Sequence, residues 1–161
     1  MEFEIFKGGR RFVPTEKKDD RSLRVFVVLS RAYKTLMDYV RQDVKQYGLN
    51  LTEFAVLELL YHKGSQTIQQ IGNRILLASG SITYVVDQLS KKGLLKRRPC
   101  EEDRRVIHVE LTEKGKEMFG QIFPKHQHAI HRALHDLSSE EKEILILLLK
   151  KLGIGVKKLN S

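Results

Sequence analysis

The stretch from Thr67 to Leu111 constrains the fold more than any other part of the 161-residue chain. Its first half holds two short segments in which apolar residues recur three and four positions apart, the spacing of helices that each bury one face. Its second half holds two segments with apolar residues at alternate positions, separated by a charged loop, which is typical of a half-buried β-hairpin. The order helix, turn, helix and hairpin predicts a winged helix-turn-helix, so the expected fold class is mainly α with a small β-hairpin wing.

The first of these helices begins at a capping box formed by Thr67 and Gln70, in which each side chain can bind the other residue's backbone N–H. The helix is only two turns long, and its predicted buried face comprises Ile68, Ile71 and Ile75. Gly72 lies inside it at a cost of about 1 kcal/mol relative to alanine. Either the next helix approaches closely there or the glycine is merely tolerated.

The second helix is predicted to expose an unusual face. We expect Ser79 to cap this helix and Gly93 to end it, with a buried side made of Ile82, Val85, Val86 and Leu89. Its opposite side presents Ser81, Thr83, Tyr84, Asp87 and Gln88. Short polar side chains let a helix backbone lie deep in a DNA groove, where hydroxyls reach phosphates and base edges. The alternative is an ordinary solvent-exposed helix.

The hairpin is predicted from Leu94–Arg98 and Val106–Leu111, with a polar loop between the two strands. Arg104 and Arg105 lie in this loop, where a guanidinium can enter the narrow and electronegative minor groove. Asp103 would be repelled by phosphates, so we expect it to pair with an arginine and fix its direction. The alternative is a solvated charged turn.

The flanking segments predict long helices that one small core cannot cover. From about residue 19 to 47, apolar residues follow one helical stripe that stops at Gly48, a span of roughly 40 Å at 1.5 Å per residue. A second long helix begins at a Thr112 cap, and a third, apolar on more than one side, begins at a capping box of Ser138 and Glu141. We therefore expect one protomer of residues 1–161, in which 1–50 and 112–161 form a homodimer around a DNA-binding region, 51–111. Residues 1–17 show no period and are expected to form an arm.

The helix that opens the central region has two candidate caps. Asn50 and Glu53 have capping-box spacing, and Thr52 is a rival cap that the sequence does not eliminate. The helix is predicted to end at Lys63–Gly64.

The charge of the chain favours a polyanionic partner. Lysine and arginine number 29 against 20 aspartates and glutamates, which gives a net charge of +9. The single cysteine, Cys100, cannot form an intrachain disulfide, so we expect a reducing, cytoplasmic environment. No apolar run approaches the roughly 20 residues of a membrane-spanning helix, and the N-terminus carries no recognisable secretion signal. We expect no membrane partner.

Several motifs within this pattern resemble the MarR family of bacterial transcriptional regulators over roughly residues 20 to 155. They are Ser79–Thr83, Val86–Leu89, Lys91–Leu94, Asp103–Arg105 and Leu111–Gly115. The resemblance implies a dimer that reads a pseudo-palindromic operator, mostly as a repressor, with the helix at 79–92 in the major groove and Arg105 in the minor groove. It also implies release by small aromatic or phenolic compounds or by oxidants. Residues 47–89 are most similar to the subgroup that answers hydroquinones and catechols.

The predicted contacts follow from these patterns and from the resemblance. Those to double-stranded DNA are Thr67, Gln69, Ser79, Ser81, Thr83, Tyr84, Gln88, Arg97, Asp103, Arg104 and Arg105. In the family an effector pocket lies where the first, second and fifth helices meet the reading head, which is the DNA-binding region and corresponds here to residues 51–111. Its candidates here are Tyr33, Phe54, Tyr61 and His62, with ordinary core packing as the alternative. Cys100 is the candidate redox residue, because nearby arginines favour a reactive thiolate, although a cysteine without a role is the simpler interpretation.

Other functions have weaker support. His128, His131 and His135 share a helical face and, with His126, suggest either a metal-responsive regulator or a histidine-rich contact between subunits. We expect no cofactor and no enzymatic activity, because the sequence has no recognisable phosphate-binding loop, paired-carboxylate site or nucleophile elbow. A winged-helix module that binds protein rather than DNA is the remaining alternative, and the arginines of the wing argue against it.

Overall fold

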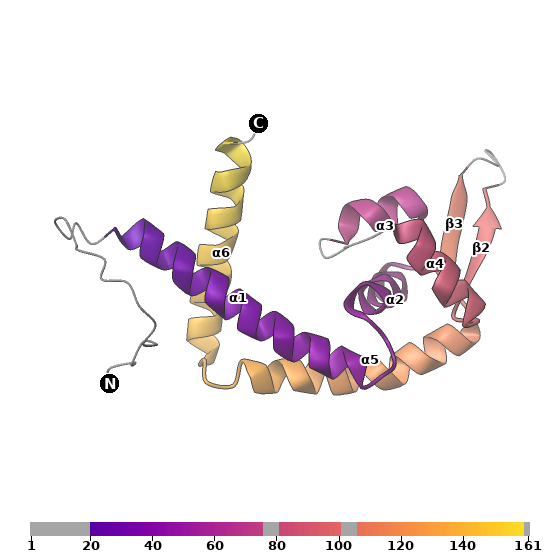
Figure 1. The fold of residues 1–161 in the computed structure, drawn as a ribbon, viewed down its shortest axis with the longest axis horizontal. Coiled ribbons are helices and arrows are strands. Elements are labelled where there is room, and N and C mark those ends of the chain that lie inside the picture. The colour runs from indigo at the N-terminus through magenta and orange to yellow at the C-terminus, as the bar shows by residue number, and fades with distance from the viewer. Residues whose placement is uncertain (1–19, 76–80, 101–105, 160–161) are drawn as a thin grey trace, which may run out of the picture. The chain divides into compact units, whose positions relative to one another are not determined.

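The computed structural model describes residues 20–75, 81–100 and 106–159. Helices predominate, and the strands form one small antiparallel sheet, so the predicted fold class is confirmed. The elements in chain order are α1 (Arg21–Lys45), α2 (Leu51–Lys63), β1 (Gln66–Thr67), α3 (Ile68–Arg74), α4 (Ile82–Lys91), β2 (Leu95–Pro99), β3 (Ile107–Leu111), α5 (Glu113–Ala133) and α6 (Ser139–Leu159). Figure 1 shows α2, α3 and α4 gathered beside β2 and β3, with α5 leading away from the sheet.

The chain divides into two compact units, Met1–Thr35 and Leu36–Ser161. The described part of the first unit is the N-terminal portion of α1, where the large apolar side chains are mostly exposed. These side chains include Leu23, Phe26, Val28 and Tyr33. The second unit holds the rest of α1 and all the other elements, and it contains the hydrophobic core.

Reciprocal hydrogen bonds fix the first residues of α2 and α3. The Asn50 side chain accepts from the Glu53 N–H and the Glu53 carboxylate accepts from the Asn50 N–H, both at 2.9 Å. Asn50 rather than Thr52 is therefore the cap of α2. Thr67 and Gln70 form the same pair before α3, at 3.2 and 2.9 Å. These bonds confirm both predicted capping boxes. The boxes could be predicted because the two partners of each lie only three residues apart.

The helix α4 begins later than the sequence predicts. Its N-cap is Ser81, whose extended backbone (φ −65°, ψ 119°) precedes the first helical residue, Ile82. The prediction that Ser79 caps this helix is therefore wrong, and Ser79 itself lies outside the described residues. Two serines are equally good caps by type, so only the backbone conformation distinguishes them. The helix ends at Lys91, two residues before Gly93, whose φ of 72° is the left-handed conformation expected there.

The sheet has one strand more than the predicted hairpin. β2 pairs antiparallel with β3, with Arg97 opposite Val109, and each strand starts one residue later than predicted. β1 pairs with the other side of β3, with Thr67 opposite His108, so the strand order is β1-β3-β2. A strand of two residues is too short to show an alternating pattern, so β1 could not be predicted from the sequence.

The core lies where α2, α3, α4, β3 and α5 meet. Its largest fully buried side chains are Phe119, Leu57, Ile71, Leu89, Val44, Val56, Val86 and Val109. Ile82 of α4 is the neighbour of Gly72, but a Cβ added to Gly72 would lie at an ordinary contact distance of 3.8 Å from Ile82 Cγ1. Close approach therefore does not require the glycine, and tolerance is the better interpretation.

Two long helices follow the wing. The predicted caps at Thr112 and at Ser138 with Glu141 are both present. α5 buries one face, whereas α6 has no buried residue. The exposed apolar side chains of α6 include Ile144, Leu147, Leu148, Ile154 and Leu159. No helix in the described ranges combines the length and the apolar character needed to span a bilayer.

Candidate nucleic-acid interface

The exposed face of α4 carries the side chains that the sequence assigned to it. Ser81, Thr83 and Tyr84 are exposed, and the Tyr84 side chain is 63% exposed despite its aromatic ring. Gln88 is half-buried one turn further on. The opposite face is fixed in the core by Val85, Val86 and Leu89. The helix is therefore held from behind while its hydroxyls and phenol ring face outward.

An ion pair joins this helix to the wing. Arg97 of β2 contacts Asp87 of α4, with Nη2 and Oδ1 2.5 Å apart and both side chains partly exposed. Asp87 was expected on the outward face, but its pairing with Arg97 was not predicted from the sequence. The sequence did hold a signal for this pair, since a carboxylate on a face that is predicted to contact DNA needs a nearby cation. Arg97 has further N–H groups, so it can hold Asp87 and still donate to a phosphate.

The first turn of α4 leaves donors available. Ser81 makes no side-chain capping hydrogen bond, and no acidic residue lies in the first turn. The N–H groups at such an end, together with the helix dipole, favour a bound anion such as a phosphate. At the start of α3 the Thr67 hydroxyl already accepts from the Gln70 N–H, whereas Gln69 is exposed.

The wing adds basic side chains beside α4. Lys96, Arg97 and Arg98 are exposed along β2, and Lys96 also pairs with Glu110 of β3 at 3.2 Å. The two strands continue to the base of the loop, where the Cys100 N–H donates to the Val106 carbonyl at 2.9 Å. The predicted contacts Asp103, Arg104 and Arg105 lie outside the described residues.

Cys100 sits at this base with intermediate exposure and as a free thiol. Arg97 and Arg98 precede it on β2, while Arg104 is outside the described ranges. The redox role of Cys100 stays a prediction.

Of the four candidate effector residues, one is buried in the core and three are exposed. Phe54 is only 4% exposed, and its ring lies 5.2 Å from that of Phe119 and 4.5 Å from that of His126, centroid to centroid. It is therefore a core residue, and its assignment to an open pocket wall is not supported. Tyr61 and His62 are exposed and lie edge to face at 5.3 Å. Tyr33 is exposed within the first unit.

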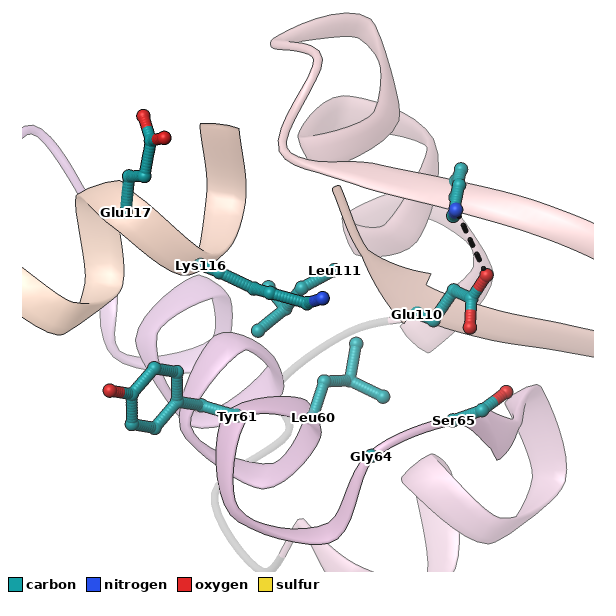
Figure 2. A pocket seen from close by; sticks show the side chains of 9 residues that line it. Leu60, Tyr61, Gly64, Ser65, Glu110, Leu111, Lys116 and Glu117 are labelled. Carbon is teal, nitrogen blue, oxygen red and sulfur yellow. Dashed lines mark ion pairs between the residues drawn. The ribbon is translucent and has the colours of Figure 1, made fainter. Parts of the chain in front are cut away.

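Tyr61 borders a cleft of about 600 Å³ between α2, the wing strands and the start of α5. Its lining is Leu60, Tyr61, Gly64, Ser65, Lys96, Glu110, Leu111, Lys116 and Glu117. Figure 2 shows the Lys116 side chain reaching into the middle of the cleft, and the Tyr61 ring at the edge with its hydroxyl pointing away from Lys116. The cleft thus combines apolar walls with cations and carboxylates, which suits a small amphipathic molecule.

The histidines of α5 have separate environments. His126 is buried, and its Nδ1 lies 2.7 Å from Oδ2 of Asp43 on α1, so it is part of the interior of the protomer. His128 and His131 have rings 6.5 Å apart, and His135 bonds to the carbonyl of its own turn. Among the residues with described positions, no group of three or more His, Cys, Asp or Glu is arranged to hold a metal ion. The pairing of His126 with Asp43 could not be predicted from the sequence, because a partner 83 residues away leaves no local signal.

Comparison with known proteins gives a consistent set of relatives. A model of the MarR family matches residues 49–107. The chain is 50% identical to the HTH-type transcriptional regulator MhqR of Bacillus subtilis over 142 residues, which cover 88% of this chain and 98% of MhqR. It is 32% identical to the transcriptional repressor MprA of Escherichia coli over 119 residues, which cover 73% of this chain and 68% of MprA.

Solved structures share the fold. AbsC, a MarR family transcriptional regulator from Streptomyces coelicolor, matches with a TM-score of 0.77 at 20% identity, covering 89% of this chain and 99% of AbsC. BpsR of Bordetella bronchiseptica, whose DNA binding is regulated by 6-hydroxynicotinic acid, matches with a TM-score of 0.71 at 22% identity, covering 81% and 98%. At these identities the likeness establishes the architecture alone.

Proposed function

The chain belongs to the MarR family of transcriptional regulators, and on that premise we propose that it is a homodimeric repressor that reads a pseudo-palindromic operator and is released by a small aromatic compound. The observation that carries the DNA-reading part is the outward face of α4. Ser81, Thr83 and Tyr84 are exposed there while the opposite side of the same helix is buried. Such a helix can enter the major groove without a long side chain holding it away.

The dimer is supported by the apolar surface that one chain leaves open. α6 has no buried residue, and large apolar side chains are exposed along it and along the first part of α1. A second copy that covers these faces would remove them from water, which is the main force in association. Two reading heads would then lie in successive major grooves, roughly 34 Å apart.

We propose that different residues account for the specificity and for the affinity of DNA binding. Ser81, Thr83, Tyr84 and Gln88 would read base edges, and Arg105, oriented by Asp103, would enter the minor groove. The region 91–98, with the helix N-termini, Thr67 and Gln69, would neutralise or bind phosphates. Affinity should therefore fall steeply as salt rises.

Selection from a randomised duplex pool tests the proposal directly. The wild-type protein should enrich a pseudo-palindrome, and Arg105→Ala should weaken binding to it by about 1–3 kcal/mol, the scale of one good groove contact. Lys125→Ala, which removes one cation from an exposed position on α5, is the matched control and should have a smaller effect. Absence of any enriched sequence would favour a protein-binding module, and unchanged affinity of Arg105→Ala would remove the wing from the mechanism.

We assign the effector to the cleft beside Tyr61, because it joins the helix α2, the wing and the start of α5. A ligand there touches both the reading head and a helix that leads to the proposed dimer contacts. Saturating phenols, quinones or aromatic acids should weaken operator binding by a coupling of about 1–3 kcal/mol. Tyr61→Ala should abolish this response, whereas Tyr61→Phe should retain it, since the hydroxyl points away from the cleft interior. A panel that leaves binding unchanged at saturation would refute ligand control.

A further inference from the structure

Glu53 performs two tasks from one nearly buried carboxylate. Its Oε2 accepts from the Asn50 N–H at 2.9 Å and completes the cap of α2. Its Oε1 lies 2.6 Å from the Nζ of Lys92, the C-cap residue of α4. The Glu53 side chain is 9% exposed and that of Lys92 is 44% exposed, so the pair is shielded from solvent mainly on the side of Glu53. The start of α2 is thereby tied to the C-terminal end of α4.

The start of α5 holds the same end of α4 from another direction. Lys114 Nζ donates to the Lys92 carbonyl at 2.9 Å, and the Thr112 hydroxyl donates to the Gly93 carbonyl at 2.7 Å. The Thr112 N–H also donates to the Leu94 carbonyl at 3.0 Å. The C-terminal end of α4 is therefore fixed by two helices, whereas Ser81 at its N-terminal end makes no side-chain capping bond.

We propose that Glu53 is a positioning residue for DNA reading: its pairing with Lys92, together with the bonds from Thr112 and Lys114, sets the angle at which α4 meets the major groove. The middle of α4 rests on the core, so the contacts at Lys92 set the tilt of the helix on that support. A small change at Lys92 therefore moves Ser81 and Thr83, which would face the bases. Base readout depends on such placement more than phosphate contact does, because hydrogen bonds to base edges tolerate little displacement. The inference rests on the proposed function of α4 and adds a residue that does not touch DNA.

Electrostatics alone predicts the opposite sign for a change at Glu53. A carboxylate near a polyanion repels it, so neutralising Glu53 without any effect on geometry should tighten binding to every duplex. Loss of positioning should instead weaken binding to the preferred duplex and leave binding to unrelated DNA unchanged or tighter. The sign of the effect therefore distinguishes the two accounts.

The test compares Glu53→Gln with Glu58→Gln in the full-length protein. Glutamine at position 53 can still accept the Asn50 N–H, so the cap is retained, while the charge pair with Lys92 is lost. Glu58→Gln removes the same charge from the same helix. The measured quantity is the ratio of dissociation constants for an unrelated duplex and for the duplex that the wild type enriches from a randomised pool, at one salt concentration. We expect Glu53→Gln to lower this ratio about tenfold and Glu58→Gln to leave it unchanged, a tenfold change being about 1.4 kcal/mol.

Variants at Lys92 make the test independent of Glu53. Lys92→Met should lower the ratio as Glu53→Gln does, and the ratio of the double variant should be no lower than that of the poorer single, because both changes remove the same pair. Any loss of phosphate contact at Lys92 weakens binding to both duplexes and cancels in the ratio. Lys92→Arg keeps the pair and should retain the ratio. Additive losses, or tighter binding of Glu53→Gln to both duplexes, would overturn the proposal. A wild type that prefers no duplex would instead overturn the proposed function.

Discussion

Gly115 stands at the closest approach between α5 and the segment that follows the reading helix. A Cβ added there would lie 2.2 Å from the Leu94 carbonyl oxygen, 3.1 Å from its carbon and 3.2 Å from Leu111 Cδ2. The oxygen is part of the backbone and already accepts the Thr112 N–H at 3.0 Å, so it cannot turn aside without losing that bond. Gly115→Ala therefore forces the start of α5 away from Leu94.

The size of the effect follows from two opposing contributions. Overpacking costs about 1–3 kcal/mol, and a contact of 2.2 Å with a backbone atom belongs in the upper part of that range, about 2–3 kcal/mol. Alanine is favoured over glycine within a helix by up to about 1 kcal/mol, which offsets part of that cost. The net loss of about 1–2 kcal/mol should lower the melting temperature by about 2–8 °C for a chain of this length. Operator preference should fall as well, because the displaced segment holds the C-terminal end of α4.

Urea unfolding followed by circular dichroism, at a fixed protein concentration, measures this change. Gly72→Ala is the matched control, because its Cβ would lie 3.8 Å from Ile82 Cγ1 and meets no backbone atom at close range. That variant should raise the unfolding midpoint by gaining helix propensity alone. If Gly115→Ala proves as stable as the wild type, or if the two variants shift the midpoint alike, the packing argument is refuted.

Two further predictions concern the end of α1. Asp43→Ala should lower the free energy of unfolding in urea by about 1–3 kcal/mol, because it leaves the buried His126 without its partner. Asp38→Ala breaks an exposed pair with Arg41 and should lower it by less than about 1 kcal/mol. Equal losses in the two variants would contradict the role of burial. Burial, and then the charge of Asp43, raise the pKa of Tyr47 above its usual 10.0. As the pH rises, the Tyr47 hydroxyl therefore loses its proton in the unfolded chain before it does so in the folded chain. The contribution of Tyr47 to the free energy of unfolding is fully present below about pH 10 and is lost as the pH rises through the folded-state pKa. Tyr47→Phe should show a smaller alkaline loss of stability, and an unchanged pH profile would count against this assignment.

Features of the molecule that depend on near neighbours in the chain could be predicted from the sequence alone. The capping boxes of Asn50 with Glu53 and of Thr67 with Gln70 join residues three positions apart, so their spacing is legible in the chain. The exposed hydroxyls of α4 follow from the same periodicity that buries Val86 and Leu89. The motifs quoted for the MarR family lie largely within this central segment, which is why the family could be predicted before the structure.

The tertiary structure establishes which residues from distant parts of the chain come into contact. It paired Asp43 with His126 and Glu53 with Lys92, across 83 and 39 residues, and it placed β1 against β3. It also buried Phe54, which the sequence had offered as a pocket wall, against Phe119. Such contacts depend on how distant segments pack into one core, and a local pattern of polar and apolar residues specifies which face is buried but not what it is buried against.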